Sequence, residues 1–253
     1  MGSVGAKQSG LSDEFNGYFG ERYEEDAIER LTWANNDNII NPNYAQSTLY
    51  RKNCALCATA VPLLARGYDI EAMPRDVDQW RGFNSIFDVD YSNPNNYMLS
   101  GSTYNMMGMP SKLRISHDPN YNIKENDIPT APRGSQRVAQ AVIDKAKKWG
   151  NGGIGVMNVK WKDANSAHAV NIINQNGNVF IYDSQSNRVI HDIPKYLSRT
   201  VANHTTLVRL DNASVKKNID NETLSKMFKK SSRTRKRKNS LSDAMKIIDN
   251  MNF

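Results

Sequence analysis

The chain of 253 residues is long enough for one sizeable domain with appendages, or for two small domains. Apolar residues make up 39% and charged residues 23%, so the composition supports a folded core and excludes wholesale disorder. No stretch approaches the roughly 18 consecutive apolar residues that a membrane-spanning helix requires. The first twenty residues also lack the charged and then apolar pattern of a secretory signal peptide.

The formal net charge of +7 is concentrated near the C-terminus. Eight basic residues and no acidic one lie between Lys226 and Lys238, and without them the remainder of the chain has a net charge of −1. The densest part of this run consists of Arg233, Arg235, Lys236, Arg237 and Lys238. A run of like charge is commonly a solvated arm, which does not favour specific nucleic-acid recognition. Non-specific contact with nucleic acid, an anionic membrane or an acidic partner stays open.

The N-terminal half predicts helices. Residues 1–20 are rich in Gly and Ser and predict a flexible N-terminus, and helical spacing of apolar residues then predicts a short helix over 21–33. A second helix is expected to begin after Asn53, a favourable N-cap, and to end at Gly67. Pro62 lies inside this helix and predicts a kink or a split.

The middle of the chain is less regular. Residues 84–134 are rich in Asn, Pro, Ser and Gly and predict a long irregular segment. Ser135 is then expected to cap a helix that continues to Trp149 and is closed by Gly150.

Beyond this helix the apolar pattern becomes that of short strands. Strands are predicted over 154–161, 168–174, 178–183 and 205–210, with a brief helix over about 194–201. Because helices come first and strands later, without βαβ alternation, the sequence predicts an α+β fold with an antiparallel sheet. A small helix over 221–228, the basic run and an amphipathic helix over 241–253 are expected to follow. We therefore expect a flexible segment (1–20), one domain (21–211) and a basic tail with short helices (212–253).

One turn signal brings three polar side chains together. Asn176-Gly177 is the preferred two-residue loop of a type I′ hairpin. If it forms the loop, facing residues have numbers that sum to 353, so His168 faces Gln185 and Asp183 lies diagonally beside His168. A carboxylate beside an imidazole is the arrangement that orients a histidine as a general base.

The two cysteines are the candidates for activation by such a base. Cys54 would lie in the first turn of its helix, where the positive end of the helix dipole favours a thiolate. Cys57, one turn further along, is expected to be a small core residue. Two cysteines and four scattered histidines do not form a disulfide framework or a metal site, and no metal or cofactor is expected.

Five segments resemble a known family, the papain-fold toxins of the glutamine deamidase type. Residues 53–60 (NCALCATA) and 65–72 (ARGYDIEA) are similar to an Asn-Cys-x-x-Cys…Arg-Gly-Tyr-Asp block of that family. Residues 167–171 (AHAVN) and 182–185 (YDSQ) resemble its His and Asp-x-Gln blocks, and residues 41–44 (NPNY) resemble a lead-in to such domains. The resemblance extends over roughly residues 41–190 and is limited to these motifs.

The resemblance implies a papain-like fold, in which N-terminal helices pack on an antiparallel sheet. The composition adds a helical basic C-terminal tail to this domain. The resemblance also implies a glutamine deamidase of the kind found in bacterial toxins and phage-encoded proteins, with a glutamine-bearing protein as its substrate. In this comparison Cys54 matches the nucleophile, His168 the general base and Asp183 the residue that orients it. Asn53 and Gln185 match supporting polar positions. The protein is expected in the cytoplasm or carried in a phage particle.

Other functions are compatible with the same sequence. A cysteine peptidase would use the same three side chains, since both reactions pass through an acyl-enzyme. A non-enzymatic component of a phage or toxin system would retain the scaffold and act through the basic tail. A nucleic-acid-binding protein would show affinity that falls steeply with salt.

Overall fold

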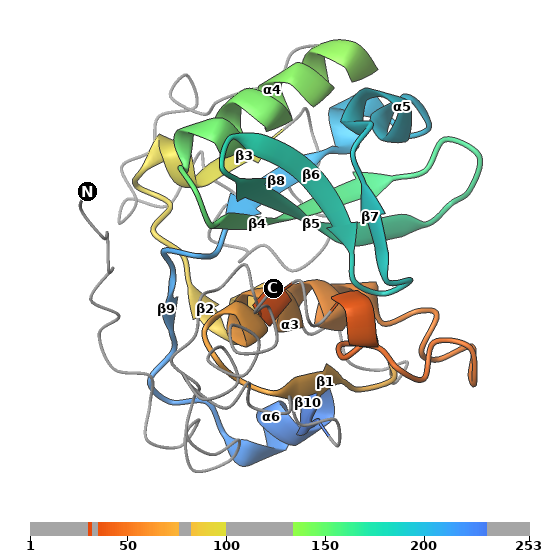
Figure 1. Ribbon diagram of the computed structural model, residues 1–253, viewed down its shortest axis with the longest axis vertical. Coiled ribbons are helices and arrows are strands. Elements are labelled where there is room, and N and C mark those ends of the chain that lie inside the picture. Colours follow the sequence, from red (N-terminus) through yellow and green to blue (C-terminus); the bar gives the residue numbers. More distant parts are fainter. Residues whose placement is uncertain (1–29, 32–34, 76–81, 100–133, 232–253) are drawn as a thin grey trace, which may run out of the picture.

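The computed structural model describes residues 30–31, 35–75, 82–99 and 134–231. Their central feature is a six-stranded antiparallel sheet with the strand order β3-β8-β4-β5-β6-β7 (Figure 1). Its strands are β3 (Tyr97–Leu99), β4 (Gly153–Lys160), β5 (Ala167–Gln175), β6 (Asn178–Asp183), β7 (Arg188–Ile190) and β8 (Thr206–Arg209). The predicted α+β class with an antiparallel sheet is therefore confirmed.

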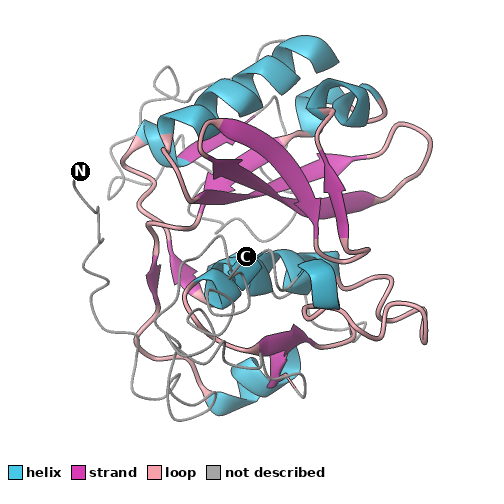
Figure 2. Ribbon diagram, viewed as in Figure 1, coloured by secondary structure: helices cyan, strands magenta, loops and turns pink. Residues whose placement is uncertain are grey.

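Helices cover both faces of this sheet. The helices that do so are α3 (Cys54–Ala65), α4 (Ser135–Lys148) and α5 (Ile193–Ser198), whereas α6 (Asn221–Met227) packs beside the short strand β10 (Phe228–Lys230). Helices α4 and α5 lie together on one face, and α3 lies on the other (Figures 1 and 2). The sheet is thus the middle layer between a helix pair and a single central helix.

The alternation of side chains along β5 separates two hydrophobic cores. Val170 and Ile172 are buried in the core beneath α4 and α5, whereas Ala169 and Ile173 are buried in the core that surrounds α3. This follows from the two-residue period of a strand, which directs successive side chains to opposite faces. Because both faces are buried, the register of β5 is strongly specified.

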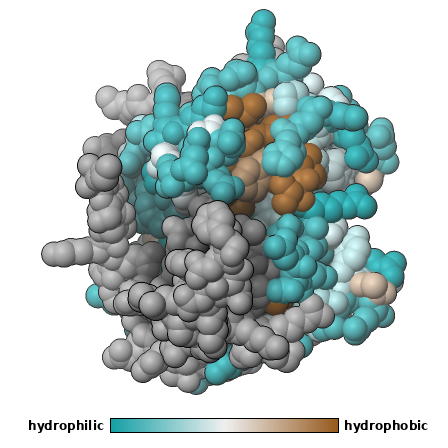
Figure 3. Space-filling view, in the orientation of Figure 1, coloured by the Kyte–Doolittle hydropathy of each residue, from teal (hydrophilic) through white to brown (hydrophobic). Residues whose placement is uncertain are grey.

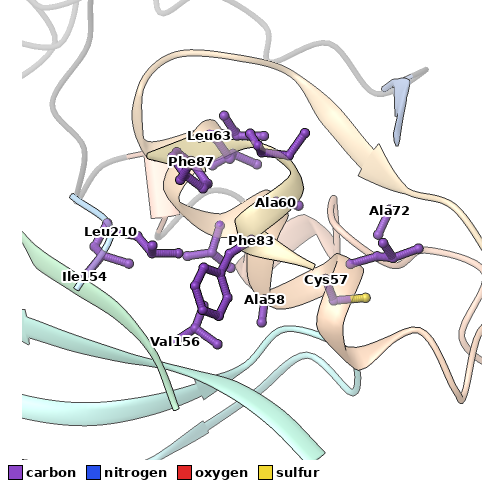
Figure 4. Packing of buried hydrophobic residues seen from close by; sticks show 14 of the residues in the cluster. Cys57, Ala58, Ala60, Leu63, Ala72, Phe83, Phe87, Ile154, Val156 and Leu210 are labelled. Atoms are coloured by element: carbon purple, nitrogen blue, oxygen red, sulfur yellow. The ribbon is translucent and has the colours of Figure 1, made fainter. Parts of the chain in front are cut away.

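Helix α3 is buried on nearly all sides. Residues 56–64 are all buried, which is typical of a helix in the middle of a core. Figure 4 shows Cys57, Ala58 and Leu63 extending from α3 in different directions among neighbours such as Phe83. As predicted, the helix begins after Asn53, and Gly67 follows its end with a φ of 104°. Pro62 does not split it, because α3 is continuous from Cys54 to Ala65.

The prediction that residues 84–134 form one irregular segment is wrong for its first part. This part contains two 3-10 turns, η1 (Phe83–Ser85) and η2 (Pro94–Asn96), and two short strands, β2 (Phe87–Asp88) and β3. β3 is an edge strand of the main sheet, and β2 pairs with β9 (Ser214–Val215). Strands of two or three residues are too short to show a period, so the sequence pattern does not reveal them. Residues 100–133 lie outside the described residues.

The start of the segment assigned to the basic tail is part of the packed body. Strand β10 (Phe228–Lys230) follows α6 and pairs with β1 (Ile70–Ala72). Lys229 Nζ lies 2.9 Å from Glu71 Oε2, and Ser231 Oγ donates a 3.0 Å hydrogen bond to Glu71 Oε1. The boundary expected at residue 211 is therefore not the edge of the packed structure. Arg233, the other four basic residues singled out above and the helix expected over 241–253 lie outside the described residues.

Most other predicted elements agree with the structure to within one or a few residues. The four long strands and the brief helix are present, the latter as α5 (Ile193–Ser198). Ser135 begins α4, but Gly134 occupies the N-cap position with a φ of 100°, so Ser135 is not the cap. Of the helix expected over 21–33, the structure describes Arg30 and Leu31, and both are helical.

The surface formed by the described residues is mainly hydrophilic. On the face shown in Figure 3, apolar surface gathers in a small patch with hydrophilic side chains around it. Among the described residues, the exposed large apolar side chains are Leu49 and Val189. No helix within these residues is long and apolar enough to cross a membrane.

Candidate active site

Cys54 is the first residue of α3 and lies against β5. The Asn53 carbonyl begins the helix by accepting hydrogen bonds from the N–H groups of Leu56 and Cys57. The Cys54 side chain is hydrogen-bonded to that of His168, and backbone N–H groups of Ala169 and Ala55 also bond to it. The sulfur thus lies beside the backbone of β5, at the positive end of a helix dipole.

His168 and Asp183 meet as the hairpin pattern predicts. Asn176 and Gly177 have φ angles of 51° and 85°, as a type I′ turn requires, and the ladder pairs Asn171 with Tyr182. His168 Nε2 lies 3.1 Å from Asp183 Oδ2, with the two side chains 12% and 13% exposed. This bond leaves Nδ1 of the ring for the thiol of Cys54.

The predicted pairing of His168 with Gln185 is wrong. The β5–β6 ladder ends at the pair of Asn171 with Tyr182, and β6 itself ends at Asp183. Gln185 lies in the turn before β7, where its Nε2 lies 3.4 Å from Asn53 Oδ1. Departure of the chain after Asp183 leaves the start of β5 without β6 as a neighbour, and the Cys54 sulfur lies beside that stretch.

The three groups shift each other's pKa values. Burial raises the pKa of the Cys54 thiol, but the hydrogen bond and charge of His168 outweigh burial, and the pKa falls below its ordinary value. Burial lowers the pKa of His168, but hydrogen bonds to Asp183 and Cys54 raise it to about 10. Burial raises the pKa of Asp183, whereas its bonds with His168 and Ser186 lower it overall. These directions all favour the charged form of the group, a thiolate for Cys54, an imidazolium for His168 and a carboxylate for Asp183.

Cys57 behaves differently from Cys54, although both lie in the first turns of α3. It is fully buried, and its Sγ donates a 3.3 Å hydrogen bond to Asn53 Oδ1. Burial and the nearby charges of Cys54 and Asp183 raise the pKa of the Cys57 thiol well above its ordinary value. The expectation that Cys57 is a core residue is confirmed, and of the two thiols it is Cys54 whose pKa is lowered.

The Asn53 side chain joins the loops that surround the start of α3. It is 1% exposed, and its Nδ2 donates to the Met73 carbonyl at 2.9 Å and to Asn41 Oδ1 at 3.3 Å. Asn41 Nδ2 in turn donates to the Gln185 carbonyl at 2.8 Å. Because both amide hydrogens of Asn53 are engaged, this side chain supports the site by holding loops and does not present an amide to a substrate.

An aromatic group that sequence reasoning missed covers the imidazole. Trp161 stacks on His168 with ring centroids 6.0 Å apart, and Arg199 lies over Trp161 at 5.4 Å. Tyr196 packs edge-on against Trp161, and burial with the nearby Asp183 and Cys54 charges raises its pKa. Trp161 lies two residues beyond Val159, which pairs with His168 in the β4–β5 ladder, and the turn signal between β5 and β6 does not set that register.

Among the residues that the structure describes, no group of three or more His, Cys, Asp or Glu side chains is arranged to hold a metal ion.

A central helix that begins with a cysteine and packs on an antiparallel sheet carrying histidine and aspartate defines the papain-like class of folds. Residues 52–188 match the family described as papain fold toxin 1, glutamine deamidase. This match spans more than half of the 253 residues, and the chain belongs to that family. The match includes Cys54, His168 and Asp183 and begins after the lead-in at 41–44. No curated protein and no solved structure matches the chain at a significant level.

Proposed function

We propose that the protein is a cysteine-dependent amidohydrolase that converts glutamine side chains of a target protein to glutamate. Cys54 acts as the nucleophile, His168 as the general acid and base, and Asp183 orients the imidazole. The observation that carries this proposal is the hydrogen-bonded row of Cys54, His168 and Asp183 at the start of α3. Membership of the glutamine deamidase family supports the same reaction.

The first half of the reaction forms an acyl-enzyme and releases ammonia. The Cys54 thiolate attacks the carboxamide carbon, and a carbon–sulfur bond forms. Backbone N–H groups at the start of α3, which have no partner within the helix, stabilise the oxyanion. The His168 imidazolium transfers its proton to the amide nitrogen, the carbon–nitrogen bond breaks and ammonia leaves.

The second half hydrolyses the thioester. Neutral His168 takes a proton from a water molecule, which attacks the thioester carbon. The carbon–sulfur bond breaks, Cys54 leaves as a thiolate and a glutamic acid side chain forms, which releases its proton to the solvent and becomes the glutamate carboxylate. The net reaction consumes one water for each ammonia released and regenerates the thiolate–imidazolium pair.

The low exposure of the site supports a side-chain substrate. The His168 and Asp183 side chains are 12% and 13% exposed, and Cys54 is only partly exposed. A carboxamide at the end of a flexible glutamine side chain is slim enough to reach a recessed sulfur. A main-chain peptide bond carries chain on both sides and requires a longer open groove.

The test is ammonia release together with mass spectrometry of the treated protein. The purified enzyme is incubated with a protected glutaminyl dipeptide and with unfolded casein. Deamidation releases ammonia and converts Gln to Glu without creating new chain ends. In water enriched in heavy oxygen, one labelled oxygen enters each new glutamate.

Three variants serve as controls. Cys54→Ala and His168→Ala are expected to lose ammonia release, whereas Cys57→Ala retains it. New chain ends that depend on Cys54 would instead identify a cysteine peptidase. A phenotype in the producing organism that survives both Cys54→Ala and His168→Ala would overturn an enzymatic function altogether.

A further inference from the structure

Pro62 creates a hydrogen-bonding problem in α3. Proline has no backbone N–H, so it cannot donate to the carbonyl of Ala58 four residues earlier, and its ring pushes that carbonyl outward. Ala58 is completely buried, on the side of α3 that faces the sheet in Figure 4. A buried carbonyl without a partner costs about 1–3 kcal/mol, so this group needs a donor from another element.

Asn171 of β5 supplies that donor. Its side chain is fully buried, and its Nδ2 donates a 2.9 Å hydrogen bond to the Ala58 carbonyl. The same nitrogen lies 3.4 Å from the Gly155 carbonyl, and Ser184 Oγ lies 3.4 Å from Asn171 Oδ1. One amide therefore joins α3, β4, β5 and the turn after β6.

These contacts lie close in sequence to all three reacting groups. Asn171 follows His168 by three residues on the same strand, and Ser184 is the residue after Asp183. Ala58 lies about one turn beyond Cys54 on α3. A shift of α3 along the sheet would change the distance from the sulfur to the imidazole, and the bond from Asn171 to Ala58 opposes that shift.

We propose that Asn171 is a positioning residue that fixes the Cys54 sulfur against His168, and that Pro62 makes α3 depend on it. This role of Asn171 rests on the proposed function, because the distance from the Cys54 sulfur to His168 matters for catalysis only if Cys54 is the nucleophile. Asn171 acts through the helix and does not touch the reacting atoms. Without the Asn171 amide, α3 can shift slightly along the sheet while the overall fold persists.

The experiment is a double-mutant cycle in the full chain with Asn171→Ala and Pro62→Ala. Two quantities are measured for each protein: the rate of Cys54 alkylation by iodoacetamide as a function of pH, and kcat for ammonia release. Asn171→Ala is expected to lower kcat by about 10²-fold and to move the alkylation profile to higher pH. Pro62→Ala restores an N–H to the helix. In that background, the factor by which Asn171→Ala lowers kcat should therefore be at least about tenfold smaller.

Asn174 offers a matched control on the same strand. Its Nδ2 donates a 3.0 Å hydrogen bond to the Ala146 carbonyl of α4, a helix without a reacting group. Asn174→Ala should lower the midpoint of urea unfolding and leave the Cys54 alkylation profile unchanged. If Asn171→Ala does not fold, Ser184→Ala removes the other end of the bridge, and it is expected to shift the alkylation profile in the same direction by a smaller amount.

The outcomes separate this proposal from the proposed function. Equal effects of Asn171→Ala with and without Pro62 would overturn the coupling. A loss of stability with an unchanged alkylation profile would reduce Asn171 to a structural residue. Alkylation does not need a substrate, so a wild-type protein without ammonia release but with the expected coupling would refute deamidation alone.

Discussion

Helices α3 and α4 lie on opposite faces of one sheet and are fixed there by different forces. Along α4, the buried side chains Val138, Ala139, Val142 and Ala146 form one stripe, and Lys145, Lys147 and Lys148 occupy the last turn. Along α3, residues 56–64 are all buried and no polar stripe exists. Burial of one apolar stripe can therefore fix the rotation of α4 about its own axis. Burial cannot fix the rotation of α3, because all of its sides are buried over residues 56–64.

Hydrogen bonds supply the orientation that α3 lacks. Asn53 holds its start, Asn171 holds Ala58, and Arg66 at its end donates through Nη2 to the Leu210 carbonyl at 2.6 Å. Such bonds are directional, whereas burial of apolar surface is not. The helix that carries Cys54 is thus fixed by directional hydrogen bonds, and α4 serves chiefly to cover the sheet.

The largest expected effect separates the two thiols of α3. Cys54→Ala should lower ammonia release by about 10⁴-fold or more, since the acyl-enzyme cannot form. Cys57→Ala should retain activity and lose about 1 kcal/mol of unfolding free energy through a small cavity. Steady-state kinetics and urea unfolding of both variants check this. Equal loss of activity in the two would remove the distinction between them.

The next largest effect is expected for Asp183, the last residue of β6. Asp183→Asn should lower kcat by about 10²- to 10⁴-fold, because the imidazole loses the charge that orients and stabilises its protonated form. Iodoacetamide labelling of Cys54 at mildly acidic pH should slow in parallel. Unchanged labelling in a folded Asp183→Asn protein would show that the carboxylate does not act through His168.

A third effect is the pH dependence of stability. The pKa of His168 is raised from 6.5 to about 10, so its stabilising contribution is complete below pH 6.5 and is lost as pH rises through about 10. The pKa of Asp183 is lowered from 3.8, so its contribution is present above that value and is lost as pH falls through the folded value. Urea unfolding across pH should show both losses, and both should shrink in Asp183→Asn. A pH profile that this substitution does not alter would contradict the linkage.

The smallest effect is expected on the face of the sheet that α4 covers. Ile172 is fully buried beneath α4, on the face of β5 opposite to α3. Ile172→Val should lower the free energy of unfolding by about 1 kcal/mol through loss of one methylene. The Cys54 alkylation profile and kcat should stay at wild-type values. A loss of activity out of proportion to this destabilisation would mean that both helices position the site.

Much of the site could be predicted because it depends on local signals. Asn176-Gly177 is a turn signal that sets the register, and the register brings His168 beside Asp183. Asn53 before an apolar helical segment likewise predicts where α3 begins and so where Cys54 lies. These are short-range preferences, written in two to four consecutive residues.

Other features could not be predicted because they depend on contacts between distant segments. Strands β1 and β10 have three residues each and exist only because they pair with each other across the molecule. The pairing expected for Gln185 failed because β6 ends at Asp183, a point that the turn signal does not determine. The role of Asn171 depends on a carbonyl in α3, 113 positions away.

The amino-acid order by itself determined the longer helices and strands, the hairpin register and the meeting of His168 with Asp183, since each follows from local backbone preference and side-chain chemistry. Only the folded structure decided which of the two thiols lies beside His168, how α3 is held and where the C-terminal strands pack. Those properties arise from burial and from hydrogen bonds between segments far apart in the chain. Neither exists until the core has closed around α3.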